Sequence, residues 1–190
     1  KTIIAKTLAR EYVKAGLNVA LMCYNQTLAN NLNYEINKDK QNNLTVLHFH
    51  RFAKRSIENK DRDWWKNNVR KDNDFWEYEV PDKLDEIIDD DFPKWDVLII
   101  DEGQDFKSFW FDILFKLVHS DSKIYIFKDD MQNIFNFYTD VPSNLKFGQY
   151  DLIENCRNCM TIIKYLKELT GKEIKTFENP PLGSEVVEKS

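Results

Sequence analysis

Apolar side chains near the start of the chain recur at helical spacing. Between Ile4 and Val13 they return every three or four residues, and Gly16 follows as a stop signal. The pattern therefore predicts a helix that begins with the first residues and ends before Gly16. Similar spacing predicts further helices at residues 27–36, 51–57, 109–118 and 159–171.

Four short segments are almost continuously apolar, at residues 18–24, 44–49, 97–100 and 123–127. Runs of this length and composition are typical of strands that helices cover on both faces. Because these strands alternate with helices, the sequence predicts an α/β fold with a mostly parallel sheet flanked by helices. Residues 59–93 break the alternation, since they are polar, charged and dotted with tryptophan, and we expect a small helical or irregular insertion there.

Charge and composition narrow the environment and the partners. The chain of 190 residues has a net charge of −5, so a nucleic-acid partner would need a local basic face. No apolar run approaches the roughly 20 residues of a membrane span, which predicts no membrane partner. Three cysteines without a secretory signature favour a reducing compartment, and we expect a cytoplasmic protein.

The segment KWDVLIIDEGQDF, at residues 94–106, ends a predicted buried strand in carboxylates. In an open parallel sheet, ligands bind beyond the carboxyl ends of the strands, which is where Asp101 and Glu102 fall. One carboxylate can hold Mg²⁺ through water while the other polarises an attacking water, because Mg²⁺ keeps several waters in protein sites. The strand and its acids alone leave open the alternative of a solvated strand end.

The first two residues, Lys1 and Thr2, stand at the start of the first predicted helix. A P-loop has the form G-x-x-x-x-G-K-[ST] and runs from a strand into a helix. If glycines precede Lys1, its ammonium would reach the β- and γ-phosphates of ATP, the Thr2 hydroxyl would ligate Mg²⁺, and the helix dipole would favour phosphate. Because the chain opens inside a helical pattern without methionine, we expect a fragment of a longer protein.

Several segments together resemble the first RecA-like ATPase domain of superfamily 1 DNA helicases of the UvrD/Rep type. VLIIDEGQDF resembles motif II, IYIFKDDMQNIF resembles motif III, and LIENCRNCMTI resembles motif IV. Residues 1–32 resemble the end of motif I and motif Ia, and LTVLHFHRFAK resembles motif Ib. The resemblance covers residues 1–169 and implies a RecA-like P-loop NTPase fold with an insertion at 59–93. Residues 170–190 would then be a linker toward a second RecA-like domain, a partner in the same protein.

The resemblance also implies hydrolysis of ATP with Mg²⁺, within an ATP-dependent helicase or translocase. Glu102 would be the general base, and Gln104 and Gln132 would sense the γ-phosphate. Arg157 would stabilise charge on the transferred phosphoryl group. The residues implied for the reaction divide by role into phosphate and Mg²⁺ binding, by Lys1, Thr2 and Asp101, and catalysis, by Glu102, Gln104, Gln132 and Arg157.

The same resemblance implies single-stranded DNA as a partner, contacted by Tyr24, Asn25, Phe49 and His50. Stacking of bases on aromatic rings would make this contact tolerant of sequence. The chain departs from the family pattern, because it lacks the P-loop glycines and the second RecA-like domain, and His48 stands where motif Ib usually has threonine. One domain alone is expected to bind nucleotide weakly and to unwind nothing.

Other side chains admit a metal, redox or stacking role, but a structural role is the simpler interpretation. The C-x-x-C at residues 156–159 lacks the second pair that a zinc site needs. The histidines of the H-F-H at residues 48–50 are expected to line a groove. Packing is the default for the tryptophans of the insertion, and Trp110 lies on the apolar face of its predicted helix.

Two other functions fit parts of the sequence. A nucleotide kinase would also use a P-loop, but it leaves the DEGQD and DDMQ segments unexplained. A non-catalytic interaction module on a retained P-loop fold would use the acidic insertion at residues 59–93 as its partner surface.

Overall fold

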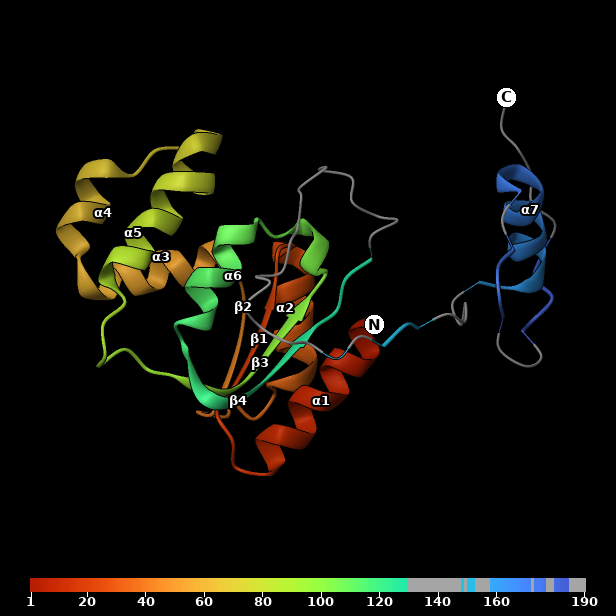
Figure 1. Ribbon diagram of the computed structural model, residues 1–190, viewed down its shortest axis with the longest axis horizontal. Coiled ribbons are helices and arrows are strands. Elements are labelled where there is room, and N and C mark those ends of the chain that lie inside the picture. Colours follow the sequence, from red (N-terminus) through yellow and green to blue (C-terminus); the bar gives the residue numbers. More distant parts are fainter. Residues whose placement is uncertain (130–147, 149, 153–157, 172, 177–179, 185–190) are drawn as a thin grey trace. The chain divides into compact units, whose positions relative to one another are not determined.

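The computed structural model spans residues 1–190 and describes residues 1–129, 148, 150–152, 158–171, 173–176 and 180–184 (Figure 1). The chain divides into two compact units, Lys1–Lys146 and Phe147–Ser190, and each is described by itself. None of the described helices is long and apolar enough to cross a membrane.

A parallel sheet forms the centre of the first unit, with the strand order β2-β1-β3-β4. In the register of the sheet, Cys23 lies opposite His48 on one side and Asp101 on the other, so the carboxyl ends of three strands are level. The parallel α/β sheet predicted from the alternation of elements is confirmed. The strands are β1 (Val19–Cys23), β2 (Leu44–His48), β3 (Trp95–Asp101) and β4 (Val118–Ile126).

Helices cover both faces of this sheet, as the continuously apolar strands predicted. The α-helices of the first unit are α1 (Thr2–Lys14), α2 (Gln26–Ile36), α3 (Phe49–Lys60), α4 (Arg62–Asn68), α5 (Val80–Ile87) and α6 (Ser108–Phe115). The described part of this unit also contains two shorter elements, the π-helix η1 (Phe75–Glu79) and the 3₁₀-helix η2 (Gly103–Asp105).

Alternate strand residues enter two separate cores. On one face, α1 and α2 bury small and aliphatic side chains against Leu21 and Ile99. On the other face, α3, α5 and α6 bury larger and more aromatic side chains against Met22 and Ile100. The sheet is thereby held between two helical layers, and its carboxyl edge is fixed by packing on both sides.

The insertion shares the larger core and does not form a core of its own. Trp65, Phe75 and Leu84 belong to the same buried cluster as the sheet residues Leu98 and Ile100. In Figure 1, α3, α4 and α5 lie together beside the sheet, and α3 leads from β2 directly into them. The polar sequence of this segment therefore reflects the exposed outer surfaces of short helices, whose inner faces are aromatic.

The boundary between α6 and β4 differs from the sequence pattern. The pattern predicts a helix through residue 118, whereas α6 ends at Phe115 and Val118 is the first residue of β4. The Leu117 carbonyl accepts a hydrogen bond from the Trp95 backbone N–H at 2.8 Å, so pairing with β3 begins here. Leu117 and Val118 are thus apolar because a strand enters the core, although their spacing continues that of the helix.

The second unit contains α7 (Met160–Thr170), which ends at Gly171 as predicted. Gly171 has φ of 64°, the left-handed conformation that glycine adopts without a Cβ penalty. The chain then returns to the start of α7, where the Met160 and Thr161 backbone N–H groups donate to the carbonyls of Pro181 and Leu182.

Candidate functional site

The carboxyl edge of the sheet has a topological switch point between β1 and β3. From β1 the chain moves to β2 on one side and later returns to β3 on the other. The two outgoing connections diverge there, and in open α/β sheets this arrangement leaves the crevice in which ligands bind. The residues that follow β1 and β3 are therefore the first candidates for a site.

Asp101, the last residue of β3, is a fully buried carboxylate. Among the described residues neither of its oxygens has a hydrogen-bond partner of full geometry. Burial raises the pKa of Asp101; the nearby Thr2 hydroxyl opposes this rise and the Glu102 charge adds to it. Thr2 and Asp101, the two predicted Mg²⁺ ligands, thus lie side by side, and a buried carboxylate next to a hydroxyl oxygen fits a hard cation.

Cys23, on the neighbouring strand β1, lies in the same buried surroundings as Asp101. It lies opposite Asp101 in the β1–β3 pair and is fully buried. Burial, together with the charges of Asp101 and Glu102, raises the pKa of the Cys23 thiol to about 12. The thiol is therefore protonated near neutral pH and is a packing residue rather than a nucleophile.

A tight turn carries the chain from β3 into η2. Glu102 adopts a left-handed conformation, with φ of 55° and ψ of 47°, which is uncommon for a residue with a side chain. The Gly103 N–H then donates to the Phe127 carbonyl at 2.8 Å, and a Cβ on Gly103 would come within 2.8 Å of the Ile126 side chain. Glycine is required there because the turn presses against the end of β4.

Gln104 connects this turn to the segment that follows β4. Its amide nitrogen donates to the Glu102 carboxylate at 2.8 Å, and its amide oxygen accepts the Asp129 backbone N–H at 2.9 Å. Gln104 is almost fully buried, so both bonds form away from bulk water. The predicted general base is therefore held in one position by a residue from its own motif.

Lys1 joins the same group through an ion pair. Its ammonium lies 2.8 Å from the Asp129 carboxylate, and both side chains are a little over a quarter exposed. Lys1, Asp129, Gln104 and Glu102 thus form a continuous chain of contacts along the carboxyl edge. Of the residues expected to meet around a triphosphate, Lys1 and Glu102 reach this edge, while Gln132 and Arg157 lie outside the described residues.

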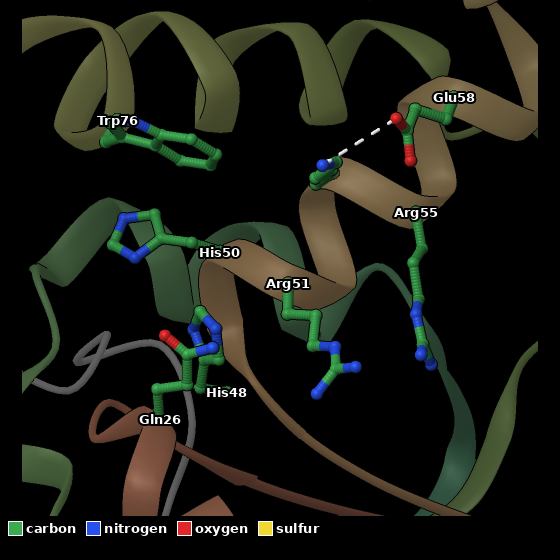
Figure 2. A pocket seen from close by; sticks show the side chains of 8 residues that line it. Gln26, His48, His50, Arg51, Arg55, Glu58 and Trp76 are labelled. Carbon is green, nitrogen blue, oxygen red and sulfur yellow. Dashed lines mark ion pairs between the residues drawn. The ribbon is translucent and has the colours of Figure 1, made fainter. Parts of the chain in front are cut away.

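Two adjoining hollows lie beside His48 and His50, rather than over the Asp101 carboxylate. They have volumes of about 560 and 450 Å³ and share Gln26 and both histidines. The larger hollow is also lined by Arg51, Lys54, Arg55, Glu58 and Trp76 (Figure 2). The smaller continues past Tyr24, Asn25, Thr27 and Asp105.

The predicted DNA contacts occupy different depths around these hollows. Tyr24 is partly exposed and stacks on Trp110, with ring centroids 6.0 Å apart. Asn25 caps α2 by accepting the Leu28 N–H at 3.0 Å, and it also lines the smaller hollow. Phe49 is fully buried and stacks on Trp110, with ring centroids 4.6 Å apart, so its ring presents no surface to a ligand here. Its role is to pack beneath Trp110, on which Tyr24 stacks.

His50 is held neutral at the junction of the two hollows. Burial lowers its pKa to about 4, with a further contribution from His48. Its Nε2 atom is buried and has no hydrogen-bond partner among the residues that the structure describes. Both His48 and His50 line the two hollows, as the sequence predicted for a groove.

The sequence interpretation misses the basic and aromatic wall of the larger hollow. Arg51, Lys54 and Arg55 recur at helical spacing on α3, a signal that the predicted helix already contains. The sequence assigns Trp76 to packing and gives no partner for Asp129. The three basic residues supply the local positive face that the net charge of the chain conceals.

Comparison with protein-family models and with characterised proteins finds no match to this chain. The fold and the two groups of residues at the carboxyl edge are therefore the basis for assigning a function.

Proposed function

We propose that this chain is the first RecA-like ATPase domain of a superfamily 1 DNA helicase or translocase. Under this proposal Lys1 and Thr2 end a P-loop, and ATP lies at the carboxyl edge of the sheet, to be closed in by a second RecA-like domain. The observation that carries the proposal is the position of the Thr2 hydroxyl next to the fully buried carboxylate of Asp101, which Glu102 follows in the chain.

The ATP site would use the contacts at the carboxyl edge as follows. Lys1 exchanges its Asp129 partner for the β- and γ-phosphates, while Thr2 and Asp101 hold Mg²⁺, directly or through water. Mg²⁺ supplies neutralisation of the phosphate charge. Glu102, fixed by Gln104, orients the attacking water and accepts its proton. By resemblance, Gln132 senses the γ-phosphate and Arg157 stabilises the charge on the transferred group.

Single-stranded DNA would bind along the two hollows beyond β1 and β2. Tyr24 and the basic residues of α3 line this groove, and both suit a chain of stacked bases and phosphates. The turn η2 lies between the two regions, because Gln104 contacts Glu102 whereas the next residue, Asp105, lines the smaller hollow. A movement of this turn would therefore reach both ligands.

The test is Glu102→Gln in the full-length protein. We expect ATP hydrolysis stimulated by single-stranded DNA in the natural protein and its loss in the variant, with nucleotide binding retained. Glu11→Gln on the exposed surface of α1 is the matched control and should leave the rate unchanged. An unchanged rate in Glu102→Gln would exclude the catalytic assignment. The residues that precede Lys1 give a second check, since the proposal requires G-x-x-x-x-G there.

A non-catalytic interaction module is the second candidate. It is favoured by the acidic residues of the insertion, since Asp90 and Asp91 are exposed and the Asp89 side chain is 54% exposed. Nucleotide binding without hydrolysis, in the presence of single-stranded DNA, would support this candidate over the first.

A further inference from the structure

We propose that Trp76 is a nucleobase-stacking residue, and that the larger hollow holds one nucleotide of single-stranded DNA with its phosphate toward Arg51 and Arg55. This inference deepens the proposed function, on which it rests for the identity of the polymer. It assigns part of the binding surface to the insertion, for which the sequence suggested only packing.

The shape of the hollow and the placement of the indole support a base at this position. A volume of about 560 Å³ falls within the range of small-molecule sites. Figure 2 shows the Trp76 indole on the opposite side of the hollow from Arg51, with His50 beside it. The rings of His50, Trp65 and Phe75 meet the indole edge to face at 5.9, 5.7 and 5.5 Å, so its orientation is supported by protein. Trp76 is nevertheless partly exposed and lines the hollow, where a base can stack on it.

The charges around the hollow suit a phosphate. Arg51 is oriented by a hydrogen bond from its guanidinium to the Asn30 side chain at 3.0 Å. Arg55 is exposed and lines the hollow, and the described part of the chain gives it neither an ion pair nor a hydrogen bond. Lys54 is shared with Glu58 at 3.8 Å and with the Trp65 ring. Arginine binds phosphate with two parallel hydrogen bonds, which makes Arg55 the principal candidate.

The neighbours of Trp76 in the chain are held by contacts with Lys107, which lies shortly after η2. Trp76 lies on the π-helix η1, a rare conformation that often occurs at functional sites. The next two residues, Glu77 and Tyr78, both contact Lys107. Its ammonium forms an ion pair with the Glu77 carboxylate at 2.6 Å and lies 3.8 Å from the Tyr78 ring centroid. Lys107 precedes α6 and follows η2 closely in the chain. The orientation of Trp76 is therefore tied to the segment that carries Glu102.

The stacking assignment is tested by titrating the full-length protein with a fluorescently labelled oligothymidylate. Trp76→Leu removes the ring but keeps apolar bulk, and we expect about tenfold weaker binding, whereas Trp76→Phe should keep most of the affinity. Trp64→Leu is the matched control, because Trp64 lies in the same insertion and does not line the hollow. In the natural protein the oligonucleotide should quench tryptophan emission, and Trp76→Phe should lose that part of the quenching while it still binds.

The phosphate assignment is tested by the salt dependence of the same binding. Arg55→Gln should lower the slope of log affinity against log salt concentration by about one, the change expected for one lost phosphate contact. Arg62→Gln, on the neighbouring helix and away from the hollow, should leave the slope unchanged. A slope that Arg55→Gln leaves unchanged would remove the phosphate from this site.

The outcomes separate this inference from the proposed function. Binding that depends on Trp76 in a protein without ATPase activity would support the subsite and reject the helicase assignment. If the natural protein has DNA-stimulated ATPase activity but binds the oligonucleotide no more tightly than Trp76→Leu does, the helicase assignment is supported and the subsite is rejected. Equal losses in Trp76→Leu and Trp64→Leu, with full quenching retained in Trp76→Phe, would also overturn the stacking role.

Discussion

The Gln104 amide donates a hydrogen bond to the Glu102 carboxylate at 2.8 Å, which leaves the same amide's oxygen to accept the Asp129 backbone N–H. The two bonds use opposite ends of one side chain, so a residue that only donates or only accepts could keep one of them but not both. Gln104 therefore fixes the candidate base and, through it, ties the end of β3 to the end of β4.

Replacement of Gln104 by methionine should affect both stability and catalysis. The substitution keeps the length of the side chain but leaves the Asp129 N–H without its acceptor, and we expect a loss of about 1–3 kcal/mol in the free energy of unfolding. ATP hydrolysis should fall because Glu102 loses its fixed position, while nucleotide affinity changes less. Urea denaturation and steady-state kinetics measure the two effects. Equal stability and equal kcat in the variant would show that the bridge does not form.

Replacement of Asp101 by asparagine should stabilise the protein without ligands and weaken its response to Mg²⁺ and nucleotide. Burial raises the pKa of Asp101, so the folded state binds a proton more tightly than the unfolded state does. This tighter proton binding adds to the free energy of unfolding at low pH, and the addition is lost as the pH rises through the raised pKa of Asp101. The asparagine amide stays neutral at every pH, so the variant avoids this loss. Thermal melting at pH 7 should show a higher Tm for the variant alone, and a smaller rise in its Tm on addition of Mg²⁺ and nucleotide. A lower Tm without ligands would contradict this account.

The sequence predicts the group around Asp101 and Glu102 better than the two hollows beside it, for a physical reason. Asp101 and Glu102 follow a buried strand, and the position of such residues at the sheet edge is fixed by local periodicity. Trp76 lies on a π-helix, whose spacing matches neither the helical nor the strand pattern, so its direction could not be inferred from sequence. Asp129 meets Lys1 only through the tertiary fold.

The protonation of His50 should make stability depend on pH in a defined window. An unfolded histidine titrates near 6.5, whereas burial lowers the pKa of folded His50 to about 4. Between these values the unfolded state binds a proton that the folded state does not, so the free energy of unfolding falls as the pH is lowered from 6.5 to 4. At higher pH the stability is fully retained.

The variant His50→Gln removes this titration and should flatten the dependence. We expect the natural protein to lose on the order of 2 kcal/mol relative to the variant across the window. The other charges that act on the ring, from His48, Glu77 and Lys107, are present in both proteins, as is the opposite slope contributed by Asp101. Urea denaturation at about pH 7, 6 and 5 gives the comparison. Parallel curves for the two proteins would show that His50 is protonated at its ordinary pKa.

The contacts of Lys107 with Glu77 and Tyr78 should couple the insertion to DNA binding. Its ion pair with Glu77 is largely shielded, since the two side chains are 11% and 28% exposed, and Tyr78 also stacks on Phe109 at 6.2 Å. Lys107→Met keeps the aliphatic stem over the Tyr78 ring but removes the charge, and we expect a loss of about 2 kcal/mol in the free energy of unfolding. Oligothymidylate affinity should fall as well, because Trp76 loses the support of its neighbours.

A double-mutant cycle with Glu77→Gln separates the ion pair from general destabilisation. If the pair orients Trp76, the loss of affinity in the double variant should be smaller than the sum of the two single losses. The exposed pair Lys14 and Glu11 on α1 provides a control cycle in which no coupling to DNA affinity is expected. Additive losses for Lys107 and Glu77 would mean that each side chain acts on its own, and that the link between η2 and Trp76 does not run through their contact.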